Sequence, residues 1–596
     1  MNSLPRTRRL KIVAQDPSIK SDDGKILTAN IDIPAEDFTH GPAGYRVHVI
    51  DYDSSTDTHY IPLSYPALQN GNYEDPFDKI TDRQILEDPN FHAQNVYAII
   101  MRTLARFEFA LGRRIDWGFD GHQLNVAPHA FADANAFYSR RDCALMFGYF
   151  RSAKNKRDEE KIVFSCLSHD VIAHETTHAI LDGLRKRFIA PSSPEQAGFH
   201  EGFADIVALL SVFSLRDVVG FLLKKNVDVK SEGAASAVDK STVVEVSDSI
   251  SISSLSKDKL RNSILFGLAD EMGEEMSGVR GQALRRSLEL KPISDDAQPY
   301  LKKPAFEEPH RCGELLVAAL LNAFIEVWDQ RLALLKKHNS GNFLNLNLVV
   351  ENGAEAAEHL LTMAIRALDY TPPTDIKFDD YLSALLTADK ETVPDDTKYN
   401  YRKQITDSFK AFGIAPASSE ADGAWQSATD EFKYDRTHFD SLTRDATEVF
   451  RFIWDNRVKL GLDDRAYTKV QSVRPCLRIT PDGFVMRETV AEYVQMTKVS
   501  AYELQQLFPP IGKPNGMKKD VEIMLYGGGT IIFDEYGRIK YHIANRIFSQ
   551  TSQADRIDYL WRYGYLPETN SSENMFAKMH LNRSATFSNH FVEEAF

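Results

Sequence analysis

Two histidines stand four residues apart, on either side of Glu175, in the segment CLSHDVIAHETTHAILDGL. Residues at this spacing share one face of an α-helix, so His174 and His178 can bind one metal ion at about 2.0–2.1 Å. Glu175 projects beside that face and can take a proton from a metal-activated water. A His-Glu-x-x-His string also arises by chance, so alone it leaves a metal site and an ordinary amphipathic helix equally open.

A third ligand is available downstream, in the apolar helical pattern AGFHEGFADIVALL. A hydrolytic zinc site uses three protein ligands and keeps a fourth position open. Glu201 follows His178 at a distance that permits a turn and an antiparallel return, and Asp205 stands one helical turn later. We therefore expect Glu201 as the third ligand and Asp205 as the acceptor of a ligand imidazole N–H. Charged groups in an apolar helix are costly without partners, so a metal explains them better than a solvated helix face.

The two segments together resemble the zinc-binding helices of the thermolysin-like metallopeptidases, the gluzincins. DVIAHETTHAILDGL resembles the first helix of that family and HEGFAD the second. The resemblance implies one zinc ion held by His174, His178 and Glu201. It further implies Glu175 as the general base and Asp205 as the residue that orients a ligand.

Three further stretches follow in the order of the family, within a resemblance that covers about residues 85–414. ANAFYSRRDCALMFGYF resembles the edge strand that pairs with the substrate backbone, which implies contacts from Asn135 and Ala136. GQALRRSLE resembles a Gly-x-x-Leu-Arg segment and implies Arg285 as a substrate-carbonyl binder, with Arg286 as the alternative. EPHRCGELLVAALLNAF resembles the turn before a buried helix and implies that His310 stabilises the oxyanion.

The sequence also departs from the family pattern. The stretch RKRFIAPSSPEQAGF, between the two zinc helices, lacks the tyrosine that assists the oxyanion, and His200 replaces the usual Asn before the glutamate ligand. Asp170 matches one calcium-site carboxylate, but Val212 stands where another acidic ligand is expected, so the calcium (Ca) site is incomplete. The signal peptide and long propeptide of the family are not evident either.

Short strand-like runs, helical periodicity and turn residues around these motifs predict an α+β protein. The resemblance makes this a zincin core, with a β-rich N-lobe containing the edge strand, the zinc helices and a mostly helical C-lobe. Gly112 is expected to end a helix that begins near Asn90. The other elements are expected as strands within 8–63 and 123–150, and as helices over 161–184, 197–215 and much of 258–414.

A chain of 596 residues is too long for one hydrophobic core, so several domains are expected. The composition of APASSEADGAW (415–425) is typical of a linker, and two hairpin-like units follow it, around Pro-Asp-Gly and Tyr-Gly turns. The expected regions are a β-rich N-terminal region (1–80), the N-lobe with the zinc helices (81–215), a helical C-lobe (216–414) with a flexible insertion near 225–257 and a possible strand at STVVEV, and an accessory domain of mixed α and β (420–596).

The net charge of -15 argues against non-specific binding to nucleic acid or to anionic membranes. The sequence contains no run of 18 apolar residues, so no membrane span is predicted. Four cysteines in so long a chain read as thiols in a reducing compartment, Cys312 among them as a small packed residue. A cytoplasmic protein is the expectation, and export without a cleaved signal stays open.

Zinc-dependent endopeptidase activity on a peptide or protein substrate is the leading hypothesis. Two alternatives are an aminopeptidase or narrow processing peptidase, and a non-catalytic zinc-containing binding module. The Gly-x-Met-Glu-Asn strand of aminopeptidase gluzincins is missing, and the intact Glu175 argues against a non-catalytic module. The sequence leaves the physiological substrate and the oligomeric state open.

Overall fold

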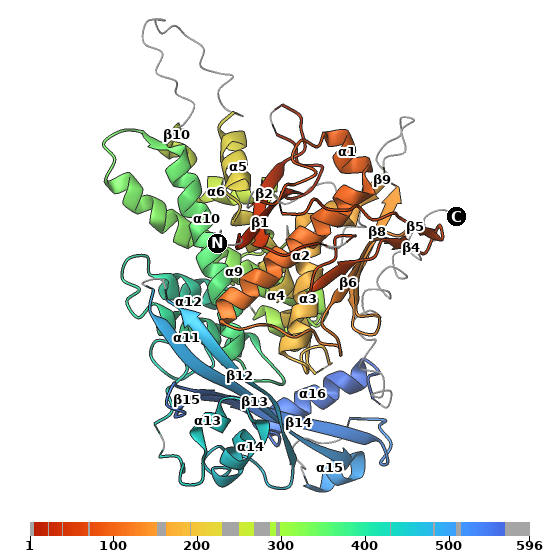
Figure 1. The fold of residues 1–596 in the computed structure, drawn as a ribbon. Coiled ribbons are helices and arrows are strands. Elements are labelled where there is room, and N and C mark those ends of the chain that lie inside the picture. The colour runs from red at the N-terminus through yellow and green to blue at the C-terminus, as the bar shows by residue number, and fades with distance from the viewer. Residues whose placement is uncertain are drawn as a thin grey trace, which may run out of the picture.

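The computed structural model describes residues 5–566, except 22, 39, 69–71, 152–161, 191, 229–248, 268–285, 294–297, 430, 481–482 and 508–513. It contains helices and mostly antiparallel sheets, consistent with the α+β class expected from the sequence (Figure 1). Most of the expected insertion near 225–257, including the possible strand at STVVEV, lies outside the described residues, and so does Arg285.

The N-terminal part is built on strands, as its alternating apolar residues predict. Strands β1 (Thr7–Val13) and β2 (Thr28–Pro34) form an antiparallel pair with one face buried. A second sheet has the order β3-β6-β8-β7, and β9 also pairs with β8. Its strands are β3 (Val47–Val49), β6 (Leu124–Phe131), β7 (Ala136–Ser139), β8 (Ala144–Arg151) and β9 (Ile162–Phe164), beside a small pair formed by β4 (Tyr52–Asp53) and β5 (Thr58–His59). Strand β7 ends this order and therefore lies at an edge of the sheet.

Helix α2 (Pro89–Leu111) follows the short helix α1 (Asp82–Glu87) and ends where the sequence predicts. Gly112 caps it with a φ of 67°, a left-handed conformation that glycine adopts without strain. A side chain at this position is excluded for a second reason, because its Cβ would lie 2.2 Å from the Leu477 carbonyl oxygen. The end of α2 therefore touches the C-terminal part of the chain.

Helices α3 (His169–Leu184) and α4 (Pro194–Phe213) pack against each other and are buried over most of their length. The helix expected over 161–184 is shorter than predicted. Ile162–Phe164 form strand β9, and Ser165–Leu167 form a 3-10 turn. The reason is tertiary: Val163 pairs with Phe150 of β8, so sheet pairing takes this apolar run before the helix begins.

A helical part follows, with α9 buried over most of its length against α4 and α12. Strands β10 (Ser249–Ser251) and β11 (Phe343–Asn345) form a small pair at its periphery. The helices are α5 (Arg216–Asp228), α6 (Lys257–Gly267), α9 (Pro309–Lys337), α10 (Leu346–Ala367), α11 (Phe378–Thr392) and α12 (Tyr401–Ala411).

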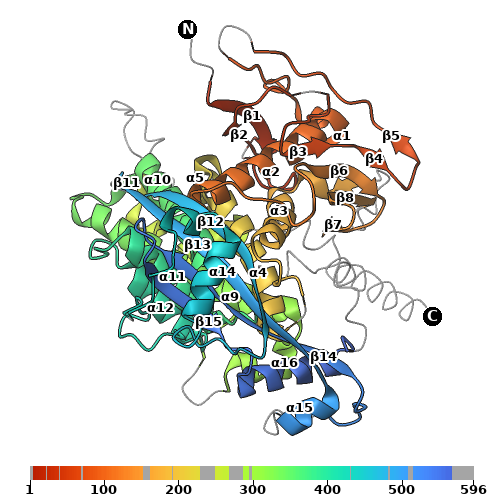
Figure 2. The same ribbon diagram turned by 60° about the horizontal axis from the view of Figure 1, so that its bottom comes forward.

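The C-terminal part is a four-stranded antiparallel sheet, which includes both predicted hairpins and has α14 packed on one face. Alternating residues face opposite ways: Val490 joins the main hydrophobic core of the molecule, and Ala491 packs towards α14. Figures 1 and 2 both place this sheet beside α11 and α12. The elements are α13 (Phe439–Leu442), α14 (Ala446–Asp455), β12 (Tyr467–Ile479), β13 (Val485–Ser500), α15 (Ala501–Leu507), β14 (Glu522–Phe533), β15 (Ile539–Asn545) and α16 (Gln550–Arg562).

Buried ion pairs cross the contact between this sheet and the helices. Asp369 accepts two hydrogen bonds from Arg113, each 2.6 Å long, and also pairs with Arg478 of β12. Arg185, which caps the C-terminus of α3, pairs with Glu492 of β13. Charges in the interior are stable only when they are paired, so the sheet supplies partners that the helical part requires.

The stretch 415–425, which the sequence predicts as a linker, packs against α11. The backbone N–H of Ser418 donates to Ser383 at 3.0 Å, and that of Trp425 donates to Thr387 at 2.7 Å. The Trp425 indole N–H donates to the Tyr370 carbonyl oxygen at 2.8 Å. Small polar residues are typical of linkers, but here the backbone N–H groups of the stretch donate hydrogen bonds to hydroxyl groups of a neighbouring helix.

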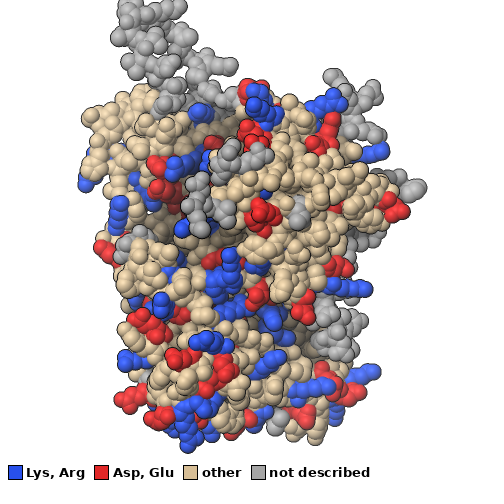
Figure 3. All heavy atoms as spheres, in the orientation of Figure 1, with Lys and Arg blue, Asp and Glu red and all other residues tan. Residues whose placement is uncertain are grey.

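Within the described ranges, no single helix is long and apolar enough to cross a membrane, although one sharply bent pair, Pro194–Phe213 with Arg216–Lys224, meets the criteria jointly. Acidic and basic side chains are interspersed over the face shown in Figure 3. That face therefore does not present the continuous basic surface that non-specific nucleic-acid binding requires.

Candidate metal centre

The predicted ligands His174, His178 and Glu201 meet where α3 and α4 pack together. Each is at most 2% exposed, and their donor atoms all lie within 4.8 Å of one another. His174 Nε2 lies 2.8 Å from His178 Nε2 and 3.6 Å from Glu201 Oε2, and His178 Nε2 lies 3.9 Å from Glu201 Oε1. A tetrahedral ion with bonds of 2.0–2.1 Å separates neighbouring donors by about 3.3 Å, so this set fits a single metal ion.

The neighbours of the two histidines fix how their rings are presented. Asp205 Oδ1 lies 2.7 Å from His174 Nδ1, so this nitrogen carries the proton and Nε2 turns its lone pair towards the other donors. This is the role predicted for Asp205. His200 stacks on His178, with ring centroids 4.7 Å apart and an interplanar angle of 26°. Burial lowers the pKa of His200 to about 4, so it packs against the ligand as a neutral ring.

Glu201 is held as a carboxylate, the form that binds a metal. Burial alone would raise the pKa of its carboxyl group, but the imidazoles of His310, His174 and His178 outweigh burial and hold the pKa well below its usual value. Glu175, which follows His174 on α3, is fully buried beside this set. The cluster thus gathers two imidazoles and two carboxyl groups in the protein interior.

A contact between glycines brings His310 to the same place. Helix α4 crosses α9 at Gly202 and Gly313, where a Cβ added to Gly202 would lie 2.7 Å from the Gly313 carbonyl oxygen. This close approach sets His310 Nε2 3.2 Å from Glu201 Oε2, while His310 Nδ1 lies 2.9 Å from Glu308 Oε1. His310, predicted from its turn before an apolar helix, therefore lies beside the ligand set.

The edge strand is tied to α3 by side chains that the sequence did not single out. Asn135 precedes β7, and Ala136 is its first residue and fully buried. The Tyr138 hydroxyl donates to Asp182 Oδ2 at 2.9 Å, and Arg140 Nε donates to the same oxygen at 2.6 Å. Asp182 lies one helical turn after His178, so β7 is fixed relative to α3, the ligand helix, which carries the candidate ligands His174 and His178.

The remaining predicted residues do not join the cluster. Arg286, the alternative to Arg285, pairs with Glu314 Oε1 at 2.6 Å. Asp170 Oδ1 accepts the backbone N–H of Val171 at 2.9 Å, and Val212 is buried in the hydrophobic core. Asp170 therefore forms a hydrogen bond at the start of α3, and Val212 packs in the core from α4.

Sequence reasoning also missed the stacking of His200, the Glu308 partner of His310, and a second group of buried donors, His92, His129 and Cys166. His200 directly precedes a predicted ligand, and Glu308 stands two residues before His310 in the quoted motif, so local sequence could have indicated both.

No protein-family model matches the sequence, and a search of curated proteins finds no match. The geometry of the site is therefore what supports a function.

Proposed function

We propose that the protein is a zinc-dependent endopeptidase with a thermolysin-like zincin core. The observation that carries the proposal is the convergence of His174, His178 and Glu201, with Asp205 on the far side of His174. Two imidazoles and one carboxylate form the ligand set of catalytic zinc in hydrolases. A zinc ion bound there would polarise the scissile carbonyl and lower the pKa of water in its open position.

The residues of the chain then carry out the proton transfers and the positioning. Glu175 takes the proton of the attacking water and passes it to the leaving amine. Asp205 keeps His174 Nδ1 protonated, so that Nε2 stays a ligand. His310 lies between the carboxylates of Glu308 and Glu201, and in its doubly protonated form its Nε2 carries a proton that it can donate to the oxyanion.

Strand β7 offers an edge along which a substrate backbone can align. Strand β7 lies at a sheet edge, and its neighbours Tyr138 and Arg140 connect it to Asp182 on the ligand helix. A peptide that pairs with this edge would be held extended at a fixed distance from His178. Asn135 and Ala136 stand at the start of the strand and are the predicted backbone contacts.

Zinc analysis combined with cleavage profiling tests the proposal. The purified protein should contain stoichiometric zinc, and Glu175→Ala should keep it while cleavage of a peptide library falls by at least about a hundredfold. Thr176→Ala is the matched control, because it removes only a hydrogen bond of 2.6 Å to Ile172 on the same helix. Zinc-free active protein, or a Glu175→Ala variant with full activity, would contradict the proposal.

A further inference from the structure

A second group of metal-binding side chains lies away from the site described above. His92 of α2, His129 of β6 and Cys166 of the 3-10 turn Ser165–Leu167 place one donor atom each within 4.8 Å of one another. All three residues are at most 2% exposed. Three distant segments of the chain thus bring two imidazoles and a thiol together in the interior.

The hydrogen bonds of the two rings determine which nitrogens carry protons. His92 Nε2 lies 2.9 Å from the Ile85 carbonyl oxygen, so this nitrogen is the donor. His129 Nδ1 lies 2.8 Å from Asp51 Oδ2, so here Nδ1 is the donor. The two remaining nitrogens, His92 Nδ1 and His129 Nε2, face each other 2.8 Å apart. In neutral rings both present lone pairs, which repel each other unless a cation or a proton lies between them.

The arrangement repeats the geometry of the candidate metal centre. His174 and His178 also bring two ring nitrogens to 2.8 Å, and Asp205 holds His174 as Asp51 holds His129. A carboxylate behind a histidine is the usual support of a metal ligand, because it fixes the ring and its tautomer. The Cys166 backbone is fixed as well, since its carbonyl oxygen accepts from Asn95 Nδ2 at 2.9 Å.

A divalent ion would balance the charges that the group carries once Cys166 binds as a thiolate. With Cys166 as thiolate and Asp51 as carboxylate, the group carries two negative charges beside two neutral imidazoles. A divalent cation makes the buried set neutral, which avoids the cost of uncompensated charge in the interior. Nitrogen and sulfur ligands together favour a transition metal, of which zinc is the commonest with such ligands, over magnesium and calcium, which prefer oxygen.

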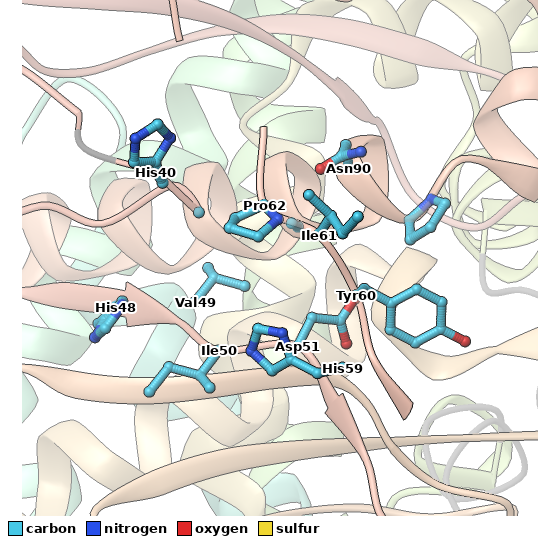
Figure 4. Close-up of a pocket in the computed structure, with 13 residues that line it drawn as sticks. His40, His48, Val49, Ile50, Asp51, His59, Tyr60, Ile61, Pro62 and Asn90 are labelled. Atoms are coloured by element: carbon cyan, nitrogen blue, oxygen red, sulfur yellow. The ribbon is translucent and has the colours of Figure 1, made fainter. Parts of the chain in front are cut away.

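A surface pocket of 220 Å³ lies near the group, and Asp51, the partner of His129, is one of its lining residues. Figure 4 shows Asp51 in this pocket, beside His59 and Tyr60. Asp51 is 8% exposed and contacts His129 directly, and the Tyr60 ring lies 5.0 Å from the His129 ring. Asp51 thus lines the pocket and contacts His129 at the same time.

We propose that His92, His129 and Cys166 bind a structural zinc ion, separate from the ion of the proposed catalytic centre. This ion joins α2, β6 and the turn that leads into α3, which begins at His169, three residues after Cys166. Its role is to hold the N-terminal sheet to the start of the ligand helix. The competing arrangement is a proton between the two rings, with His129 doubly protonated against Asp51 and Cys166 as a packed thiol.

Metal analysis of the purified full-length protein separates the two sites. We expect two zinc ions per chain in the wild type, and one in His129→Gln and in His178→Ala. If the catalytic proposal alone fails, the wild type holds one zinc that His129→Gln loses and His178→Ala keeps. If the structural site fails, His129→Gln holds as much zinc as the wild type, and the proposal is overturned.

Cobalt substitution gives a readout that does not depend on any variant folding. Co²⁺ bound by a thiolate absorbs in the near ultraviolet through charge transfer from sulfur, whereas a site of imidazole and carboxylate ligands lacks this band. The cobalt-loaded wild type should show the band, and Cys166→Ala should lose it. Cys476→Ala, at another buried cysteine, is the control and should keep it. A cobalt-loaded wild type without the band contradicts the proposal.

Discussion

The Tyr138 hydroxyl donates a hydrogen bond of 2.9 Å to Asp182, and this contact joins the edge strand β7 to the ligand helix α3. Asp182 is fully buried and also accepts from Arg140. One carboxylate, a helical turn from His178, thus sets the distance between the strand and the candidate metal centre.

Tyr138→Phe should lower kcat/KM for peptide cleavage by about fivefold, because a hydrogen bond of about 1 kcal/mol that positions the strand is lost. Zinc content should not change, since no ligand is touched. Tyr149→Phe is the control: Tyr149 lies in β8 of the same sheet as Tyr138, and the change removes a hydrogen bond of 2.6 Å to Asp53 of β4. Steady-state kinetics on one peptide decide the question, and equal losses in both variants would count against a positioning role.

Gly313→Ala should force α4 and α9 apart, because the added Cβ would lie 2.9 Å from both the Gly198 carbonyl oxygen and the Gly202 nitrogen. His310 then moves away from Glu201, and kcat should fall by about tenfold or more while zinc remains. Gly220→Ala is the matched control, since the nearest atom to its Cβ is Val350 Cγ2 at 3.6 Å. Full activity in Gly313→Ala would show that the crossing does not position His310.

Glu492→Gln should lower the free energy of unfolding by about 3–5 kcal/mol, because it leaves the Arg185 guanidinium buried without its carboxylate. Glu522→Gln removes the exposed pair with Lys498 and should cost at most about 1 kcal/mol. Denaturant unfolding of both variants measures the difference. A Glu492→Gln variant as stable as Glu522→Gln would mean that the buried pair contributes little.

The stability of the C-terminal sheet should fall in mild acid through His542. Burial lowers the pKa of this histidine from 6.5 to about 4, with a smaller effect in the same direction from Arg546, and Nε2 lies 2.8 Å from the Tyr493 hydroxyl. The folded state favours the neutral ring, so its contribution is complete above pH 6.5 and is lost as the pH falls towards 4. The loss amounts to about 3 kcal/mol at most.

Denaturant unfolding at pH 7, 5.5 and 4.5 measures this contribution. His542→Gln should show a weaker pH dependence than the wild type between 6.5 and 4, whereas His59→Gln, at an exposed histidine, should follow the wild type. Identical slopes for His542→Gln and the wild type would exclude the assignment.

Local patterns in the sequence predicted the elements that carry the candidate metal ligands. The spacing of His174 and His178, the carboxylates of α4 and the cap at Gly112 each depend on residues a few positions apart, and the structure brings the three ligands together. The later start of α3, at His169 instead of the predicted residue 161, depends on a contact between distant segments. Pairing of β9 with β8 is a tertiary contact, which a helical periodicity does not reveal.

Contacts between distant segments escaped prediction for the same reason. His92, His129 and Cys166 come from three elements and share no motif, so composition alone marks Cys166 as an ordinary thiol. The stretch 415–425 has the composition of a linker, yet Trp425 donates to the carbonyl oxygen of Tyr370. In both cases folding brings the partner near, and the local sequence contains no pattern that predicts the contact.

Arg185 closes the ligand helix, but its carboxylate partner Glu492 belongs to a strand near the other end of the chain. During synthesis the histidines therefore leave the ribosome long before the residue that neutralises the cap of their helix. A nascent chain cannot complete this buried pair until the C-terminal sheet has been translated. The order of translation thus leaves the C-terminal end of α3 without its buried partner until Glu492 has been made.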